Sequence, residues 1–456
     1  MNLLLITFSF PPAGGVGVLR ALSLAKYLPE NGVRVDVLTA RNAPAVGKDL
    51  TLLRQVPQEV MVHRTWTLDL PFWLRKSVKK ALTGGKARPA ATVAAAPDRK
   101  GGGNPIKRMI GNLLLPDPQV GWLPFALPAA ARIIRRRSID AVVITVPPFS
   151  SVKLVPRLRK LFPSLPIVVD FRDEWLTTTL DLVSFNNNSR ARVVAEKTER
   201  EAVRDATEVV LVTEAARREL QSRYPDVPAQ RFVCINNGYD VTPPTVETVL
   251  AASRAVPPSG QRKIVLTYIG TVYGSTAPGS FVEAVLGLPA EIRSRLHVRF
   301  IGHIEAESYR EQLLSLGDAI ELKGFVPQAE ALAAIRDTDY LLLITHDRIN
   351  VAAKFYDYLG GGKPIFGVVH PDGDVRRLLE ETGAGRWADV DDPEAIGKML
   401  LETVEDAGPQ LQPDYSRIAA YHRRPLATRY AGLLKGLVQA AADERKETDL
   451  SLRGAS

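Results

Sequence analysis

The chain has a single cysteine, Cys234, among 456 residues, so it cannot form an internal disulfide or a cysteine-rich metal site. The apolar residues around Cys234 predict a small buried core residue. The six histidines are scattered, and no apolar run approaches the 18 or so residues of a membrane-spanning helix. Residues 3–10 are too short for a signal peptide and lack its basic start. We therefore expect a cytoplasmic protein without a metal centre.

The two common nucleotide-binding glycine motifs, G-x-G-x-x-G and G-x-x-x-x-G-K-[ST], are also missing. A different glycine loop, FSFPPAGGVG at residues 8–17, follows the first apolar segment and precedes a helical pattern. Gly14, Gly15 and Gly17 let the backbone approach a ligand and leave N–H groups at a helix N-terminus, where an anion is favoured. The same glycines suit a tight turn without a ligand. The loop alone leaves both interpretations open.

Acidic residues are outnumbered, 50 against 59 Lys and Arg, which gives a net charge of +9. The basic residues cluster beside aromatic and aliphatic ones at 66–80, 107–115 and 132–137. Such a mixture suits an anionic membrane surface, and an ordinary solvated basic face would look the same. No stacking-aromatic motif or recognition helix accompanies the charge, so we expect no nucleic-acid partner.

Apolar runs alternate with helical patterns along the whole chain, which predicts an α/β protein with mostly parallel sheets. A chain of 456 residues is too long for one core, so we expect two doubly wound domains in tandem. Ligands of such sheets bind at the carboxyl ends of the strands, and here that predicts a cleft between two facing domains. The predicted strands are 3–8, 33–39, 140–146, 166–171, 207–212, 231–235, 264–270, 297–301, 320–323, 340–344 and 364–368.

Composition marks the expected boundaries. Residues 82–104 are rich in Ala, Gly and Pro and predict a disordered insertion, while 241–262 contain two Pro-Pro pairs and predict the interdomain linker. The predicted parts are an N-terminal domain at 1–240, a C-terminal domain at 263–410, helices at 411–440 that return toward the first domain, and a flexible tail at 441–456.

One segment of the second domain, residues 349–367, combines a loop, a short helix, three glycines and a strand. Lys354 and Asp357 are three residues apart and can share one face of that helix. A cation near a helix N-terminus suits a diphosphate, and a carboxylate can accept hydrogen bonds from a ribose diol. The alternative is a surface ion pair worth roughly 0.2–0.5 kcal/mol.

Several separated segments together resemble the group-one (family-four) glycosyltransferases of the GT-B fold. They include residues 8–39, VVDFRDEW at 168–175, LTYIGTVYGSTAP at 266–278, ELKGFVPQ at 321–328 and AAKFYDYLGGGKPIFGVV at 352–369. The resemblance implies two facing Rossmann-like domains and a retaining transferase that takes its sugar from a nucleotide-diphosphate sugar. It implies no metal and no prosthetic group.

The resemblance also implies roles for individual residues. Lys354 is expected to contact phosphate, with Gly270 and Thr271 cradling the diphosphate and Asp357 binding the ribose. The backbone at Phe325 and Val326 is expected to meet the nucleotide base. Five residues of the first domain are expected to approach the donor phosphate, the transferred sugar or the acceptor: Gly14, Gly15, Arg20, Arg172 and Asp173.

Three departures from the family pattern stand out. Ile349 occupies the place of the first of two glutamates eight residues apart, and Asn350 is the nearest side chain that could replace its contact. Residues 271–278 lack the usual lysine, and Pro147 stands where a histidine is usual. A sugar-nucleotide epimerase of the same fold and a non-catalytic GT-B-like scaffold therefore remain alternatives. The basic, Trp-containing segments suggest a lipid-linked saccharide acceptor at the membrane face, in polysaccharide or envelope-glycan synthesis.

Overall fold

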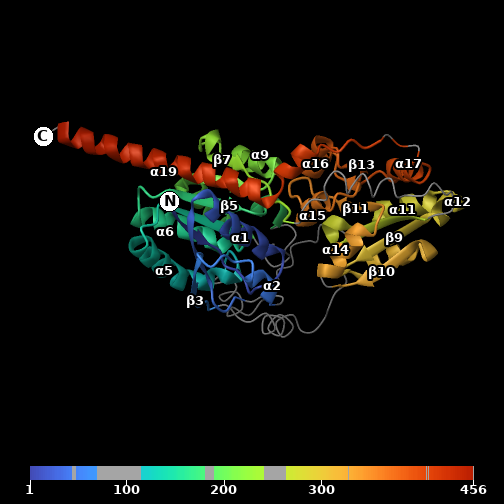
Figure 1. The fold of residues 1–456 in the computed structure, drawn as a ribbon, viewed down its shortest axis with the longest axis horizontal. Coiled ribbons are helices and arrows are strands. Elements are labelled where there is room, and N and C mark those ends of the chain that lie inside the picture. Colours follow the sequence, from blue (N-terminus) through green and yellow to red (C-terminus); the bar gives the residue numbers. More distant parts are fainter. Residues whose placement is uncertain are drawn as a thin grey trace. The chain divides into compact units, whose positions relative to one another are not determined.

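The computed structural model describes residues 1–43, 48–68, 115–179, 189–240, 263–326, 328–406, 408 and 410–454. The chain divides into two compact units: unit 1 is Met1–Asn236 with Arg423–Ser456, and unit 2 is Asn237–His422 (Figure 1). The predicted insertion at 82–104, the predicted linker at 241–262 and the basic clusters at 75–80 and 107–108 lie outside the described residues.

Unit 1 contains a parallel sheet of seven strands in the order β3-β2-β1-β4-β5-β6-β7. The order reverses between β1 and β4, so the carboxyl ends of these two strands form a topological switch point, where ligands of open sheets bind. The strands are β1 (Asn2–Ile6), β2 (Arg34–Ala40), β3 (Met61–Thr65), β4 (Ala141–Val146), β5 (Ile167–Phe171), β6 (Glu208–Leu211) and β7 (Phe232–Cys234). The helices are α1 (Val16–Tyr27), α2 (Leu50–Leu53), α5 (Leu123–Arg136), α6 (Leu154–Leu161), α8 (Ser189–Asp205), α9 (Glu214–Arg223) and α19 (Arg423–Gly454).

The core of unit 1 joins the two ends of the chain. Leu3 and Leu5 of β1 are fully buried, and Val18 of α1 and Leu434 of α19 pack in the same cluster. Helix α19 contacts α1 within this unit and continues to Gly454, through residues where we expected a flexible tail. Ala, Leu, Glu, Lys and Arg make up nine of the fourteen residues at 441–454 and are strong helix formers, which accounts for the difference.

Unit 2 contains a parallel sheet of six strands in the order β10-β9-β8-β11-β12-β13, with its switch point between β8 and β11. Its strands are β8 (Ile264–Ile269), β9 (Leu296–Ile301), β10 (Ile320–Gly324), β11 (Tyr340–Thr345), β12 (Ile365–Val369) and β13 (Gly385–Asp389). Its helices are α11 (Gly279–Gly287), α12 (Ala290–Ser294), α13 (Glu307–Leu314), α14 (Gln328–Arg336), α15 (Ala353–Gly361), α16 (Asp374–Thr382), α17 (Pro393–Val404) and α18 (Tyr415–Ala420).

The two sheets confirm the predicted α/β class and the two doubly wound domains. Cys234 is buried, as predicted. The two strands that the sequence did not predict, β3 and β13, are edge strands in these sheets. Among the described residues, no helix is long and apolar enough to cross a membrane.

Candidate functional site

The side chain of Lys354 lies at the switch point of unit 2. Lys354 stands in the first turn of α15, just after the loop that follows β11. A Cβ built on Gly270, directly after β8, would lie 3.5 Å from both Cδ and Nζ of Lys354. The sequence-predicted pair Gly270 and Lys354 is therefore brought together where the sheet order reverses.

Lys354 and Asp357 do not form the ion pair that the sequence left open. The ammonium of Lys354 lies instead 3.7 Å from the centre of the Tyr268 ring. In the described part of the chain, no carboxylate lies within 4 Å of this ammonium. Burial lowers the pKa of Lys354 to about 7. A partly buried cation without a protein counter-charge is stabilised by an anionic ligand, so this position favours the binding of one.

Two tyrosines hold this arrangement in place. Tyr358, on α15, accepts a hydrogen bond from the Ile269 N–H at 2.8 Å and donates to the Leu342 carbonyl at 3.4 Å. It thereby links α15 to both strands of the switch point. Tyr268 donates to the Thr271 carbonyl at 2.8 Å, which fixes the ring beneath Lys354 and the loop beside it. The position of Lys354 is thus set by the strands themselves.

Glycines with positive φ end three neighbouring strands of unit 2. Gly270 follows β8 with φ 134°, Gly302 follows β9 with φ 137°, and Gly324 ends β10 with φ 66°. The Gly302 N–H donates to the Gly324 carbonyl at 2.7 Å. A Cβ on Gly302 would lie 2.2 Å from the Gly270 carbonyl oxygen, so only glycine fits there. This contact sets the path of the chain at Gly270.

The loop after β11 is organised by an aspartate that the sequence did not single out. Asp347 accepts hydrogen bonds from the N–H groups of Ile349 and Asn350 at 2.8 and 2.9 Å. The Asn350 amide donates to the same carboxylate at 3.1 Å. Ile349 is buried. Asn350 therefore shapes the loop, and at least one of its amide hydrogens is engaged by the protein.

The remaining predicted residues of unit 2 lie at the same sheet edge or on α15. Thr271 follows Gly270, and Asp357 lies one turn beyond Lys354 and is half-buried. Phe325 and Val326 come directly after β10, two strands from β8. The Phe325 side chain is 88% exposed. These positions suit a ligand that extends from the switch point along the carboxyl ends of β9 and β10.

In unit 1 the predicted Arg172 lies next to the glycine loop. Its Nε donates to the Val146 carbonyl at 3.1 Å, and its terminal nitrogens donate to the carbonyls of Gly17 and Pro147. Arg172 thus joins the carboxyl ends of β4 and β5 to the loop after β1. Gly15, with φ 100°, caps α1 in that loop.

Arg20 is mainly engaged by protein groups. Its guanidinium contacts the Asp170 carboxylate at 2.7 to 3.0 Å and donates to the carbonyls of Ile235 and Asn236. The Arg20 side chain is 9% exposed and that of Asp170 is fully buried. Asp173, by contrast, is exposed. The structure therefore gives Arg20 a structural role at the centre of unit 1, and its contact with the donor or acceptor stays a prediction.

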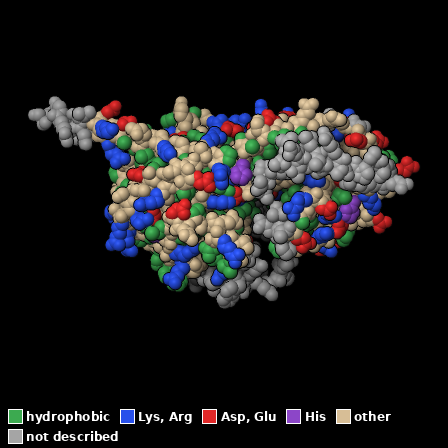
Figure 2. All heavy atoms as spheres, viewed as in Figure 1, with side chains coloured by type: hydrophobic (Ala, Val, Ile, Leu, Met, Phe, Trp, Pro, Cys, Tyr) green, Lys and Arg blue, Asp and Glu red, His purple; other side chains and the backbone are tan. Residues whose placement is uncertain are grey.

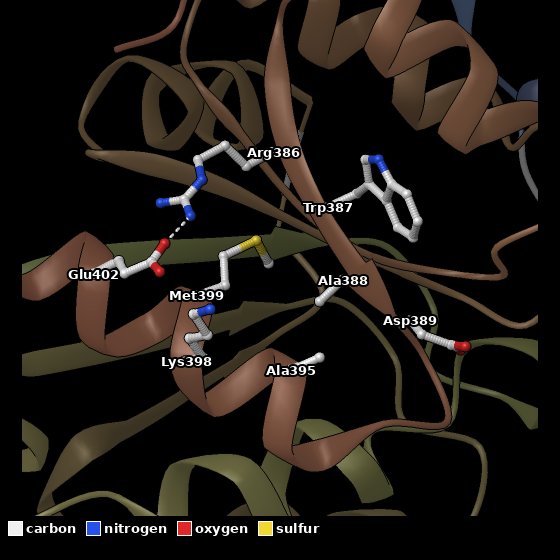
Figure 3. Close-up of a pocket in the computed structure, with 8 residues that line it drawn as sticks. All are labelled: Arg386, Trp387, Ala388, Asp389, Ala395, Lys398, Met399 and Glu402. Atoms are coloured by element: carbon white, nitrogen blue, oxygen red, sulfur yellow. Dashed lines mark hydrogen bonds and ion pairs between the residues drawn. The ribbon is translucent and has the colours of Figure 1, made fainter. Parts of the chain in front are cut away.

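A separate pocket of about 410 Å³ lies between β13 and α17 (Figure 3). Arg386 on β13 forms an ion pair with Glu402 on α17 across it. None of the sequence-predicted site residues lines this pocket. It lies at the edge strand, two strands away from β11 and the switch point.

Comparison with known proteins agrees with this geometry. Residues 14–238 match the family model described as glycosyl transferase 4-like domain. No curated protein matches the chain by sequence. Solved structures of similar fold include Anabaena Alr3699/HepE in complex with UDP, which is 14% identical with a TM-score of 0.54, over 98% of this chain and 100% of that one.

Two further structures have the same fold. The lipopolysaccharide outer core galactosyltransferase WaaB is 13% identical with a TM-score of 0.57, over 98% of this chain and 100% of that one. WaaG, a glycosyltransferase involved in lipopolysaccharide biosynthesis, is 13% identical with a TM-score of 0.53, over 97% and 98%. Residues 14–238 are thus a glycosyl transferase 4-like domain and the whole chain has the GT-B fold, which supports the resemblance to the group-one (family-four) glycosyltransferases.

Proposed function

We propose that the chain is a retaining glycosyltransferase that moves a sugar from a nucleoside-diphosphate sugar to a saccharide or lipid-linked saccharide acceptor. The observation that supports this most strongly is the Lys354 ammonium, which lies against Gly270 and over Tyr268 without a described carboxylate nearby. Its charge, together with the N-terminal end of α15, which has no side-chain cap, suits a diphosphate.

The reaction places negative charge on the departing diphosphate as the bond to the sugar breaks. Lys354 would stabilise that charge, and loss of one such contact typically costs about 3–4 kcal/mol of barrier. Gly270 and Thr271 would approach the phosphates through their backbone. Asp357 would accept hydrogen bonds from the ribose, and the segment at Phe325 and Val326 would meet the base.

The residues of unit 1 would serve the transferred sugar and the acceptor. Gly14 and Gly15 lie in the loop after β1, and Arg172 fixes this loop through the Gly17 carbonyl. Asp173 is exposed at the carboxyl end of β5 and would meet a hydroxyl group of the acceptor. The net charge of +9 supports an acceptor at an anionic membrane face in polysaccharide or envelope-glycan synthesis, with the protein peripheral to that membrane.

The HepE structures contain UDP and UDP-glucose, so UDP-glucose is the first donor to test. The protein would be incubated with UDP-[14C]glucose and a bacterial lipid extract, with Lys354→Met as the matched inactive variant. We expect label in the lipid-extractable product with wild type and none with the variant, and an axial anomeric linkage by NMR. Epimerised donor without acceptor would instead indicate an epimerase. Absence of binding to UDP, GDP and ADP alike would indicate a scaffold.

A further inference from the structure

Two exposed apolar side chains follow β3 on a backbone that is firmly held. Trp66 is 56% exposed and Leu68 is 72% exposed, whereas Thr67 between them is buried. Thr67 and Asn42 exchange two hydrogen bonds, of 2.9 and 3.0 Å, and the Leu68 N–H donates to the Gly121 carbonyl at 3.2 Å. The segment therefore displays Trp66 and Leu68 outward from a fixed extended strand end.

The charge around these two side chains is basic. The Arg41 guanidinium lies 4.9 Å from the centre of the Trp66 ring. Residues 37–43 and 60–68, which bring these side chains together, contain no Asp or Glu. Arg64 is exposed and donates to the Pro11 carbonyl, which links β3 to the loop after β1. A surface that combines exposed apolar side chains with the guanidinium groups of Arg41 and Arg64 is complementary to an anionic one.

More exposed apolar groups lie at the first residues of α1 and α2. Val16 and Leu50 are each 64% exposed. The Asp49 N–H donates to the Pro12 carbonyl at 2.8 Å, so the segment before α2 is paired with the loop after β1. Figure 2 shows hydrophobic side chains interleaved with Lys and Arg side chains on the lower part of unit 1. The exposed apolar surface therefore extends beyond Trp66 and Leu68.

We propose that Trp66, Leu68 and Arg41 form a docking tip that inserts into the interface of an anionic phospholipid bilayer. Tryptophan suits the headgroup region because its ring is apolar and its N–H is polar. Leu68 would bury beside it, and Arg41 would pair with lipid phosphate while its guanidinium still covers the ring. The docking tip belongs to the same sheet edge as the glycine loop of unit 1. This inference rests on the membrane-bound acceptor in the proposed function.

Sedimentation of the full chain with lipid vesicles tests the docking tip. The vesicles would contain equal parts of phosphatidylglycerol and phosphatidylcholine, or phosphatidylcholine alone. The variants are Trp66→Ser, Leu68→Ser and Arg41→Gln, with Leu314→Ser as the matched control because Leu314 is 50% exposed on α13 of unit 2. UDP binding by calorimetry is measured for every variant.

We expect wild type to prefer the anionic vesicles. Trp66→Ser and Leu68→Ser should each lower the partition coefficient about tenfold, and Arg41→Gln about fivefold. Leu314→Ser should match wild type, and all variants should retain UDP binding. Equal binding by wild type and the three tip variants would overturn the proposal, as would equal binding to both kinds of vesicle. A change of oligomeric state in the tip variants, without any vesicle binding, would show that a second copy covers this surface. Failure of wild type to bind UDP would contradict the proposed function while leaving the docking tip standing.

Discussion

The ammonium of Lys354 lies 3.7 Å from the centre of the Tyr268 ring, and that ring stacks on Phe300 with centroids 4.7 Å apart. An aromatic face attracts a cation without neutralising it. The lysine is therefore positioned by the core of unit 2, and its charge remains available to a ligand. A carboxylate in the place of Tyr268 would position the lysine equally well but would compete with the phosphate.

The lowered pKa of Lys354 predicts that nucleotide affinity depends on pH. In the free protein the lysine loses its proton as the pH rises through about 7, whereas the diphosphate binds the protonated form. UDP affinity should therefore fall as the pH rises from 7 to 9, by up to about tenfold per unit. Calorimetry at pH 6, 7, 8 and 9 measures this change in UDP affinity. Lys354→Arg is the control, because a guanidinium stays charged throughout and its affinity should be flat between pH 7 and 9. A UDP affinity of wild type that does not change with pH would contradict the assignment of Lys354 to the phosphate site.

Gly302→Ala should disturb the nucleotide site from a distance. The new Cβ would lie 2.2 Å from the Gly270 carbonyl oxygen, and the positive φ of Gly302 adds strain. We expect a loss of about 2–4 kcal/mol in the free energy of unfolding and weaker UDP binding. Gly274→Ala is the control, since a Cβ there meets nothing within 4 Å. Urea unfolding and UDP titration check both effects. A Gly302→Ala protein with unchanged UDP affinity would mean that the path of the chain at Gly270 does not matter for binding.

Arg20→Met should destabilise unit 1, because it leaves the fully buried Asp170 carboxylate without its partner. Breaking a buried ion pair in this way costs about 3–5 kcal/mol. Arg192→Gln, which breaks the exposed pair with Glu196, should change the free energy of unfolding by less than about 0.5 kcal/mol. Denaturant unfolding distinguishes the two variants. If Arg20→Met keeps wild-type stability but loses transfer activity, the main role of Arg20 is to bind a ligand and its structural role is minor.

Most of the strands that the sequence predicted lie in the interior of the sheets. The residues of β1 and β4 are almost all apolar, and so are those of β12. β3 reads MVHRT and β13 reads GRWAD, because each lies at the edge of its sheet and is only partly buried. Their polar residues hide the alternating pattern of a strand. One edge strand of each sheet was therefore missed, while the other edge strands, β7 and β10, and the central strands were found.

The same limit applies to the site. The spacing of Lys354 and Asp357 places both on α15 but does not show which way the lysine turns. Its contact with Tyr268 spans 86 residues of sequence and depends on the packing of α15 against β8. Arg20 and Asp170 are 150 residues apart, so no local spacing reveals their pairing. Gly302 directly follows an apolar strand in the sequence. This position was the signal that could have identified it as part of the site.

Titration of UDP, GDP and ADP into wild type and Lys354→Met by calorimetry tests the central claim most directly. A hydrogen bond between an ammonium and a phosphate contributes about 1.5–3 kcal/mol, so the variant should bind the preferred nucleotide about 10- to 150-fold more weakly. Circular dichroism and the unfolding midpoint should match wild type, because no described carboxylate is left unpaired by the change. Equal affinity of the two proteins for the nucleotide would contradict the assignment of the diphosphate to Lys354.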